Sequence, residues 1–238
     1  MGIRAPREYR TLSVVVPVYN ERPTLAEVIR RMRAVQLPLE LEIIAVDDGS
    51  SDGSGQVLRA LQDSTVRVLS HGRNQGKGAA VRTGLAAARG DLVLIQDADL
   101  EYDPEDWLRL LDPILKGKAR VVYGSRFTGE RKNMFPTHWL GNRVLTLTTN
   151  ILYQTTLSDM ETCYKLFDRE VLQGLRIESN RFDFEPEITA KVLRRGERIY
   201  EVPISYAGRE FAEGKKITWR DGFAAMSALI RYRLRRRV

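Results

Sequence analysis

Acidic side chains follow three of the short apolar runs of this sequence. Glu21 comes after the first run, Asp47 and Asp48 after the second, and Asp97 and Asp99 after a later one. If these runs are neighbouring parallel strands, the carboxylates gather at one edge of a sheet and repel each other unless a cation binds among them. Mg²⁺ and Mn²⁺ prefer such oxygen ligands. The pattern therefore predicts a divalent metal that carries a nucleotide diphosphate.

Residues 96–101 (QDADLE) lead from an apolar run into a loop. Asp97, Asp99 and Glu101 alternate along this segment, so we expect their side chains to converge on one ion. An ordinary turn, in which Asp caps the helix after Pro104, would use the same residue types. The metal site is favoured because the other acidic clusters also follow apolar runs.

Residues 47–53 (DDGSSDG) have two interpretations. They suit a turn that caps a helix, and they also suit a loop whose carboxylates accept hydrogen bonds from a nucleobase or a ribose. We expect Asp52 to be the N-cap of the next helix and Asp48, at the end of the strand, to contact the ligand.

The glycine-rich segment 72–78 (GRNQGKG) does not have the spacing of a phosphate-binding loop. The Walker pattern needs four residues between its first Gly and Gly-Lys, followed by Ser or Thr, but three intervene here and Gly follows. Residues 17–21 (PVYNE) likewise take the place of a dinucleotide-binding Gly-x-Gly-x-x-Gly turn. P-loop, kinase-like and NAD-dependent functions therefore lose support.

The acidic clusters need elements that place them together, and the apolar pattern predicts these. Helical spacing of apolar residues separates strands expected at residues 12–18, 41–46, 66–69, 92–96 and 120–124. This alternation predicts an α/β, Rossmann-like, doubly wound and mostly parallel sheet, with ligands beyond the carboxyl ends of its strands. After Arg126 we expect helices at 137–153, 186–195 and 219–235 and strands at 164–167 and 199–204.

The composition fits one globular domain spanning residues 1–238. The chain is 43% hydrophobic and 29% charged, and no linker or repeat divides it. Its single cysteine, Cys163, cannot form an intramolecular disulfide, and no apolar stretch approaches the roughly 20 residues of a membrane-spanning helix. A cytoplasmic location is expected. His71 and His138 lack metal or triad spacing, so neither receives a role.

Four segments together resemble the inverting family 2 glycosyltransferases of the GT-A fold: VPVYNE (16–21), VDDGSSDG (46–53), NQGKG (74–78) and QDAD (96–99). Three later segments are similar to those of polyprenyl-phosphate hexosyl transferases, the dolichyl-phosphate mannose synthases and glucosyltransferases: GSR (124–126), YKLF (164–167) and VPISY (202–206). The resemblance implies a nucleotide-sugar half at about residues 10–126 and an acceptor half at about 127–238.

The resemblance also implies roles for individual residues. Nucleotide-sugar binding would fall to Pro17, Tyr19, Glu21, Asp48, Gly76, Lys77 and Asp97. Mg²⁺ or Mn²⁺ would be held by Asp97, Asp99 and Glu101. The acceptor phosphate would be bound by Arg126, Arg143, Arg209 and Lys215. The catalytic residues would be Asp99, Arg126, Arg209 and Lys215.

The expected reaction is metal-dependent, inverting transfer of a hexose from GDP-mannose or UDP-glucose to a dolichyl or undecaprenyl phosphate. A lipid phosphate is already anionic near neutral pH and attacks without a general base. A family 2 enzyme acting on a hydroxyl acceptor is the alternative, with Asp159 or Glu161 as base. Nucleic acid is not an expected partner, because basic and aromatic residues do not interleave on one surface.

Basic residues are concentrated near the C-terminus. Residues 205–238 contain nine basic and three acidic side chains, so this segment carries most of the chain's net charge of +7. Arg231, Arg233, Arg235, Arg236 and Arg237 can meet an anionic membrane surface, at roughly 1 kcal/mol for each charge. A solvated basic tail is the other interpretation. The prediction is a cytoplasmic enzyme with peripheral contact at the membrane.

Overall fold

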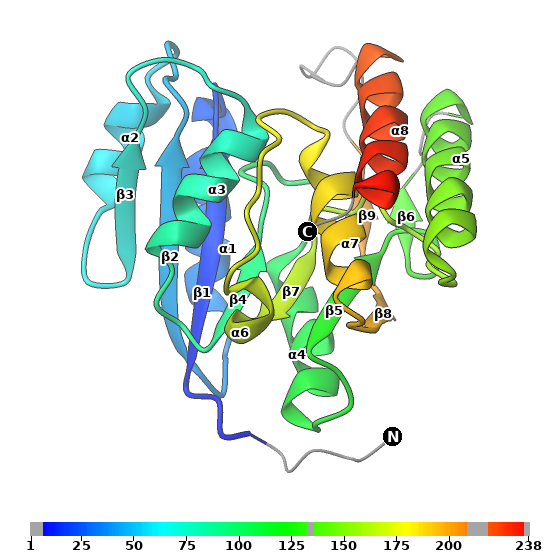
Figure 1. Ribbon diagram of the computed structural model, residues 1–238. Coiled ribbons are helices and arrows are strands. Elements are labelled where there is room, and N and C mark those ends of the chain that lie inside the picture. Colours follow the sequence, from blue (N-terminus) through cyan, green and yellow to red (C-terminus); the bar gives the residue numbers. More distant parts are fainter. Residues whose placement is uncertain (1–6, 133–135, 209–218, 236–238) are drawn as a thin grey trace.

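The computed structural model describes residues 7–132, 136–208 and 219–235, and confirms the α/β class (Figure 1). Seven strands form one sheet in the order β3-β2-β1-β4-β7-β5-β8. Neighbouring strands are parallel, except that β7 runs antiparallel to both β4 and β5. The strands are β1 (Thr11–Val18), β2 (Glu40–Asp47), β3 (Val66–Ser70), β4 (Leu92–Ile95), β5 (Val121–Ser125), β7 (Lys165–Asp168) and β8 (Ile199–Pro203).

A second, two-stranded sheet pairs β6 (Arg131–Lys132) with β9 (Tyr206–Ala207). The helices are α1 (Arg22–Ala34), α2 (Ser54–Leu61), α3 (Lys77–Ala87), α4 (Trp107–Leu115), α5 (Pro136–Tyr153), α6 (Arg169–Leu172), α7 (Phe184–Arg194) and α8 (Trp219–Leu234), with a short 3₁₀ turn η1 (Pro104–Asp106). Within the described ranges, none of these helices combines the length and apolar character that crossing a bilayer requires.

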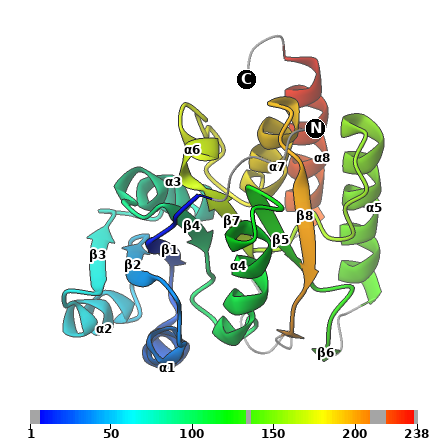
Figure 2. The same cartoon turned by 90° about the horizontal axis from the view of Figure 1, so that it is seen from below.

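The helices cover both faces of the sheet. Helix α3 packs on one face, and α1 and α2 lie on the other (Figure 2). Strand β1 is therefore buried on both sides, and Leu12, Val14, Val15 and Val16 are fully inaccessible. This burial explains why the strand is a continuous apolar run rich in β-branched residues. Helices α5 and α8 lie side by side beyond the β8 end of the sheet (Figure 1).

The register of the strands brings the acidic clusters to one edge. Val18 of β1 pairs with Asp47 of β2, and Val15 pairs with Ile95 of β4. The loops that follow β1, β2 and β4 consequently leave the sheet at neighbouring positions. This is the edge at which ligands bind in open α/β sheets.

The predicted N-cap of α2 is wrong by one position. Gly53 occupies that place, with φ of 98°, a conformation that favours glycine. Asp52 stands one residue earlier, where its Oδ1 accepts the backbone N–H of Ser54 at 2.9 Å and its Oδ2 accepts that of Arg22 at 3.0 Å. Asp52 thereby ties the starts of α1 and α2 together.

Candidate active site

A cavity of about 860 Å³ lies at the carboxyl edge of the sheet. Helices α5 and α8 supply part of its wall through residues such as Asn142 and Ala225. The sequence-predicted residues that line it are Pro17, Tyr19, Glu21, Asp48, Gly76, Lys77, Asp97, Asp99, Glu101 and Arg126. Arg209 and Lys215, which are also predicted to bind the acceptor phosphate, lie outside the described residues.

Asp48 fixes the loop between β3 and α3. Its carboxylate accepts the backbone N–H groups of Gln75 at 2.9 Å and Gly76 at 2.7 Å. His71 Nδ1 lies 2.6 Å from Asp48 Oδ1, and its Nε2 lies 2.9 Å from the Thr83 hydroxyl. His71, for which no role was predicted, thus orients Asp48 at the cavity wall.

Two of the three glycines of the 72–78 segment, Gly76 and Gly78, allow close packing. Gly76 has φ of 101°, and a Cβ there would lie 2.2 Å from the carbonyl oxygen of Asn180. The same carbonyl accepts the N–H of Ala79 in the first turn of α3. Only a residue without a side chain lets the 179–181 loop approach α3 this closely, which explains the glycine-rich pattern without a phosphate-binding loop.

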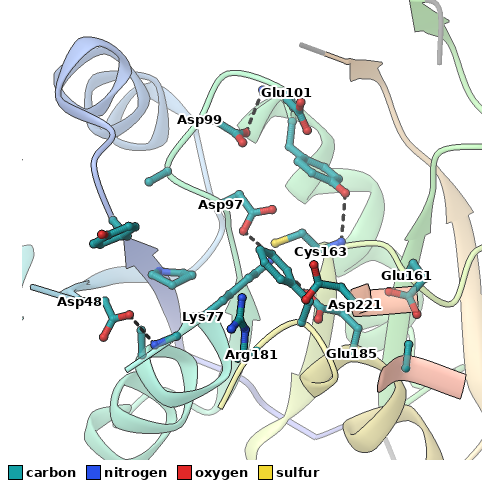
Figure 3. Close-up of a pocket in the computed structure, with 18 of the residues that line it drawn as sticks. Asp48, Lys77, Asp97, Asp99, Glu101, Glu161, Cys163, Arg181, Glu185 and Asp221 are labelled. Carbon is teal, nitrogen blue, oxygen red and sulfur yellow. Dashed lines mark hydrogen bonds and ion pairs between the residues drawn. The ribbon is translucent and has the colours of Figure 1, made fainter. Parts of the chain in front are cut away.

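Lys77 lies between two carboxylates on the cavity floor (Figure 3). Its Nζ is 2.9 Å from Asp97 Oδ1 and 3.0 Å from Glu185 Oε1. Burial alone would lower the pKa of Lys77, but Asp97 and Glu185 together raise it well above its usual range. Lys77 is therefore a fixed positive charge beside Asp97.

The three carboxylates predicted to hold one ion do not converge in the structure. Asp97 pairs with Lys77, the Oδ1 of Asp99 accepts the N–H of Glu101 at 3.1 Å, and Glu101 Oε2 accepts the Tyr206 hydroxyl at 3.0 Å. Among the residues that the structure describes, no three acidic, His or Cys side chains form a metal-binding group. Each carboxylate therefore has its own partner. The hydrogen bond from Tyr206 holds Glu101 toward β9.

Asp97 and Asp99 nevertheless fit a magnesium-type ion. Both line the cavity, and the side chain of Asp97 is 21% exposed. Mg²⁺ in nucleotide sites commonly takes only one or two carboxylates and completes its shell with phosphate oxygens and water. Two carboxylates at the cavity wall thus match the donor set that a metal–diphosphate complex needs.

Arg126 is bound more tightly within the protein than the sequence indicated. Its Nε donates to Asp159 Oδ2 at 2.7 Å and its Nη2 to Oδ1 at 2.8 Å, while its backbone N–H also reaches Oδ2. Asp159 is completely buried by this pair. The alternative assignment of Asp159 as a general base is therefore wrong, because the carboxylate has no access to an acceptor.

Arg143 does not reach the cavity. Its guanidinium lies over the rings of Phe127 and Trp139, with distances to their centroids of 5.7 and 5.9 Å. A cation on aromatic faces is stabilised by the ring quadrupoles and packs as part of the helix surface. As placed in the structure, Arg143 is not positioned to bind an acceptor phosphate in this cavity.

Glu161, a possible base for a hydroxyl acceptor on sequence grounds, also lines the cavity (Figure 3). Arg181, Glu185 and Asp221 line it as well, and sequence reasoning did not place these three there. Glu161 Oε1 and Glu185 Oε2 are buried without a hydrogen-bond partner among the residues of known placement. Buried oxygens of this kind accept a ligand hydroxyl readily. Glu185 lies in the first turn of α7, where an acidic residue is ordinarily explained by its favourable interaction with the helix dipole. Its position at the cavity therefore could not be inferred from the sequence.

We expect Glu161→Gln to remove a pH dependence of stability. Burial, reinforced by the charge of Glu185, raises the pKa of Glu161 to about 8. Between pH 5 and 8 the native protein keeps a proton that the unfolded chain releases, so stability falls as the pH rises, by at most about 1.4 kcal/mol for each unit. Urea unfolding of wild type and E161Q at about pH 5 and about pH 8 measures this change in the free energy of unfolding. Glu105→Gln, which replaces an exposed acid, is the control. Parallel pH profiles for wild type and E161Q would contradict it.

The family model described as glycosyl transferase family 2 matches residues 13–176. The chain belongs to glycosyl transferase family 2. The match includes all three acidic clusters and Arg126, whereas Arg181, Glu185 and Asp221 lie beyond it.

Solved structures of glucosyl-3-phosphoglycerate synthase from Mycobacterium tuberculosis share the fold of this family 2 glycosyltransferase. One, with Mn²⁺, UDP and glucosyl-3-phosphoglycerate, has a TM-score of 0.73 and 23% identity, covering 94% of this chain and 80% of the other. Another, with Mn²⁺, UDP-glucose and phosphoglyceric acid, has a TM-score of 0.74 and 24% identity with the same coverage. A third, with Mg²⁺ and UDP, has a TM-score of 0.72 and 23% identity, covering 94% and 79%.

Proposed function

We propose that this family 2 glycosyltransferase carries out metal-dependent, inverting transfer of a hexose from a nucleotide sugar to a polyprenyl phosphate. The observation that carries the proposal is the joint placement of Asp48, Lys77, Asp97 and Asp99 around one cavity at the carboxyl edge of the sheet. Its volume of about 860 Å³ lies in the range of small-molecule sites.

The donor would occupy the side of the cavity nearest β1 and β2. Pro17 lies near the end of β1, Tyr19 and Glu21 follow that strand, and Asp48 follows β2. Asp48 holds the backbone of Gln75 and Gly76 in place, so that the 71–76 loop forms a rigid wall for the base and ribose. GDP-mannose and UDP-glucose are the donors we propose.

Asp97 and Asp99 would hold Mg²⁺ or Mn²⁺ together with the diphosphate. Structures of similar fold contain either ion with UDP, which supports this choice. When bound, the metal neutralises the charge that develops on the departing diphosphate. Lys77 adds a second fixed positive charge beside Asp97, and its pairing with Glu185 keeps it oriented. Displacement from the opposite face of the sugar inverts the anomeric carbon.

A hydroxyl acceptor is the second candidate, because one buried acid fits its chemistry. Attack by a hydroxyl needs a general base. Glu161 has an unpartnered oxygen at the cavity, and burial brings its pKa to about 8. A phosphate acceptor does not need this base, so Glu161→Gln should preserve transfer to polyprenyl phosphate and abolish transfer to a hydroxyl.

The two acceptors are distinguished by a transfer assay. Labelled GDP-mannose and UDP-glucose are each incubated with Mg²⁺ or Mn²⁺ and with undecaprenyl or dolichyl phosphate, and product is measured in the organic extract. The proposal expects an acid-labile lipid-linked hexose from one donor. Transfer only to water-soluble hydroxyl acceptors, lost in E161Q, would instead establish the second candidate.

We further expect Arg209→Ala to raise the acceptor KM about tenfold or more with donor affinity nearly unchanged, since one charged hydrogen bond contributes about 1.5–3 kcal/mol. This follows from the family resemblance, which gives Arg209 and Lys215 to the acceptor phosphate. Lys216→Ala is the control. Loss of nucleotide-sugar binding in R209A would show that Arg209 serves the diphosphate.

A further inference from the structure

The cations of the cavity differ in whether an acid already pairs with them. Among the residues that the structure describes, the lining contains Lys77, Arg126 and Arg181. Lys77 has two carboxylate partners, at 2.9 and 3.0 Å, and Arg126 is held at two nitrogens by Asp159. No acid in the described ranges forms an ion pair with the guanidinium of Arg181. Its charge is therefore available to a ligand.

The rest of the charged lining is acidic. The acids are Glu21, Asp48, Asp97, Asp99, Glu101, Glu161, Glu185 and Asp221. A nucleoside diphosphate that enters this cavity adds negative charge, so it is repelled unless cations balance it. The metal expected at Asp97 and Asp99 supplies part of that balance. A guanidinium without an acidic partner supplies more, because its forked N–H groups match the oxygens of a phosphate.

Arg181 lies on a loop that two helices hold in place. From α3, the Nη2 of Arg82 donates to the side-chain oxygen of Asn180 at 2.8 Å. From α7, the Oε2 of Glu187 accepts the backbone N–H of Ser179 at 2.6 Å. Because the loop is anchored on both sides, the Cα of Arg181 has a fixed position at the cavity wall. Binding through this arginine then orders only its side chain, which keeps the entropic cost small.

The side chain of Arg181 passes the start of α3, on the donor side of the cavity. A Cβ added to Gly76 would lie 3.3 Å from the Cγ of Arg181. The N–H of the same glycine donates to Asp48 at 2.7 Å, and Lys77 is the next residue along the chain. Arg181 and Lys77 both line the cavity (Figure 3). The donor is therefore the anion nearest to this guanidinium.

We propose that Arg181 binds the diphosphate of the nucleotide-sugar donor. The inference rests on the proposed function, because it adds a residue to that donor site. In the transfer, the bond between the anomeric carbon and the diphosphate oxygen breaks, its electron pair stays on that oxygen, and the acceptor oxygen forms the new bond. Arg181 stabilises the charge that the departing diphosphate gains. The residue lies beyond the 13–176 segment that the family model matches.

Titration of nucleoside diphosphates tests this assignment. The dissociation constants of UDP and GDP are measured calorimetrically on the full chain with Mn²⁺. Arg181→Gln should weaken binding of the diphosphate that wild type binds by at least about tenfold. Arg181→Lys should recover part of this loss, since an ammonium keeps the charge and lacks the fork. Arg176→Gln removes an exposed cation outside the described cavity lining and is the matched control, with wild-type affinity expected.

Thermal unfolding of each variant establishes that it folds. Equal affinity of R181Q and wild type for the diphosphate would overturn the inference and leave the proposed function standing. Unchanged nucleotide affinity with a raised acceptor KM would give Arg181 to the acceptor instead. An equal loss of affinity in R181K and R181Q, with a lowered unfolding temperature in both, would make the residue structural. Binding of neither UDP nor GDP by wild type would reject the proposed donor, and the inference with it.

Discussion

Asp99→Ala should lower kcat/KM for hexose transfer by about 10²–10³-fold or more, which is the effect of removing a group that stabilises charge in the transition state. Asp99 lies on the loop after β4, outside the regular elements, and its Oδ1 accepts the N–H of Glu101 at 3.1 Å. The variant should still fold, with the free energy of unfolding lowered by no more than about 3 kcal/mol, the upper value for a hydrogen bond to a charged group. Initial rates and urea unfolding together measure both quantities.

Two further variants isolate the charge of Asp99. Asp99→Asn keeps an oxygen for the N–H of Glu101 and removes the negative charge, so it should be nearly as inactive as D99A. Glu105→Ala removes an exposed carboxylate from the adjoining segment and should retain wild-type activity. Turnover of D99A at the wild-type rate would reject the assignment of Asp99 as a metal ligand.

Arg126→Ala should destabilise the protein by about 3–5 kcal/mol, the usual cost of removing one partner of a buried ion pair. The substitution leaves the completely buried carboxylate of Asp159 with only the backbone N–H of residue 126 from the original pair. Urea unfolding measures the loss. The double variant Arg126→Met/Asp159→Leu should recover much of it, because no charge then remains unpaired.

Arg109→Ala is the comparison for a surface pair. Arg109 is 55% exposed and lies 3.0 Å from Asp106, so its removal should cost about 1 kcal/mol or less. A small loss of stability in R126A, combined with a raised acceptor KM, would contradict the structural role and restore Arg126 to the acceptor phosphate.

The sheet and its acidic edge were predictable from the sequence. Strands such as Thr11–Val18 are apolar and β-branched along their whole length because helices cover both faces, and this pattern is local. The loops that follow parallel strands share one edge by topology, so Glu21, Asp48 and Asp97 were correctly expected at the same site. The residues on the donor side of the cavity were therefore predictable from short sequence segments alone.

The partners of the charged groups were not predictable, because they come from distant segments. Arg126 meets Asp159 only after β5 and the loop following α5 are brought together, and Glu101 is turned toward Tyr206 by β9. Glu161 precedes β7 in the chain and Glu185 follows it, and both line the cavity; the antiparallel direction of this strand has no local signal. Arg143 has cavity-lining neighbours on its helix but stacks on two aromatic rings instead.

Calorimetric titration of GDP-mannose and UDP-glucose, each with and without Mg²⁺ or Mn²⁺, tests the assigned site most directly. One nucleotide sugar should bind in the presence of the metal, bind at least about tenfold more weakly without it, and lose this metal dependence in D99A but not in E105A. Equal affinity with and without metal in the wild-type protein, or binding of neither nucleotide sugar, would contradict the account.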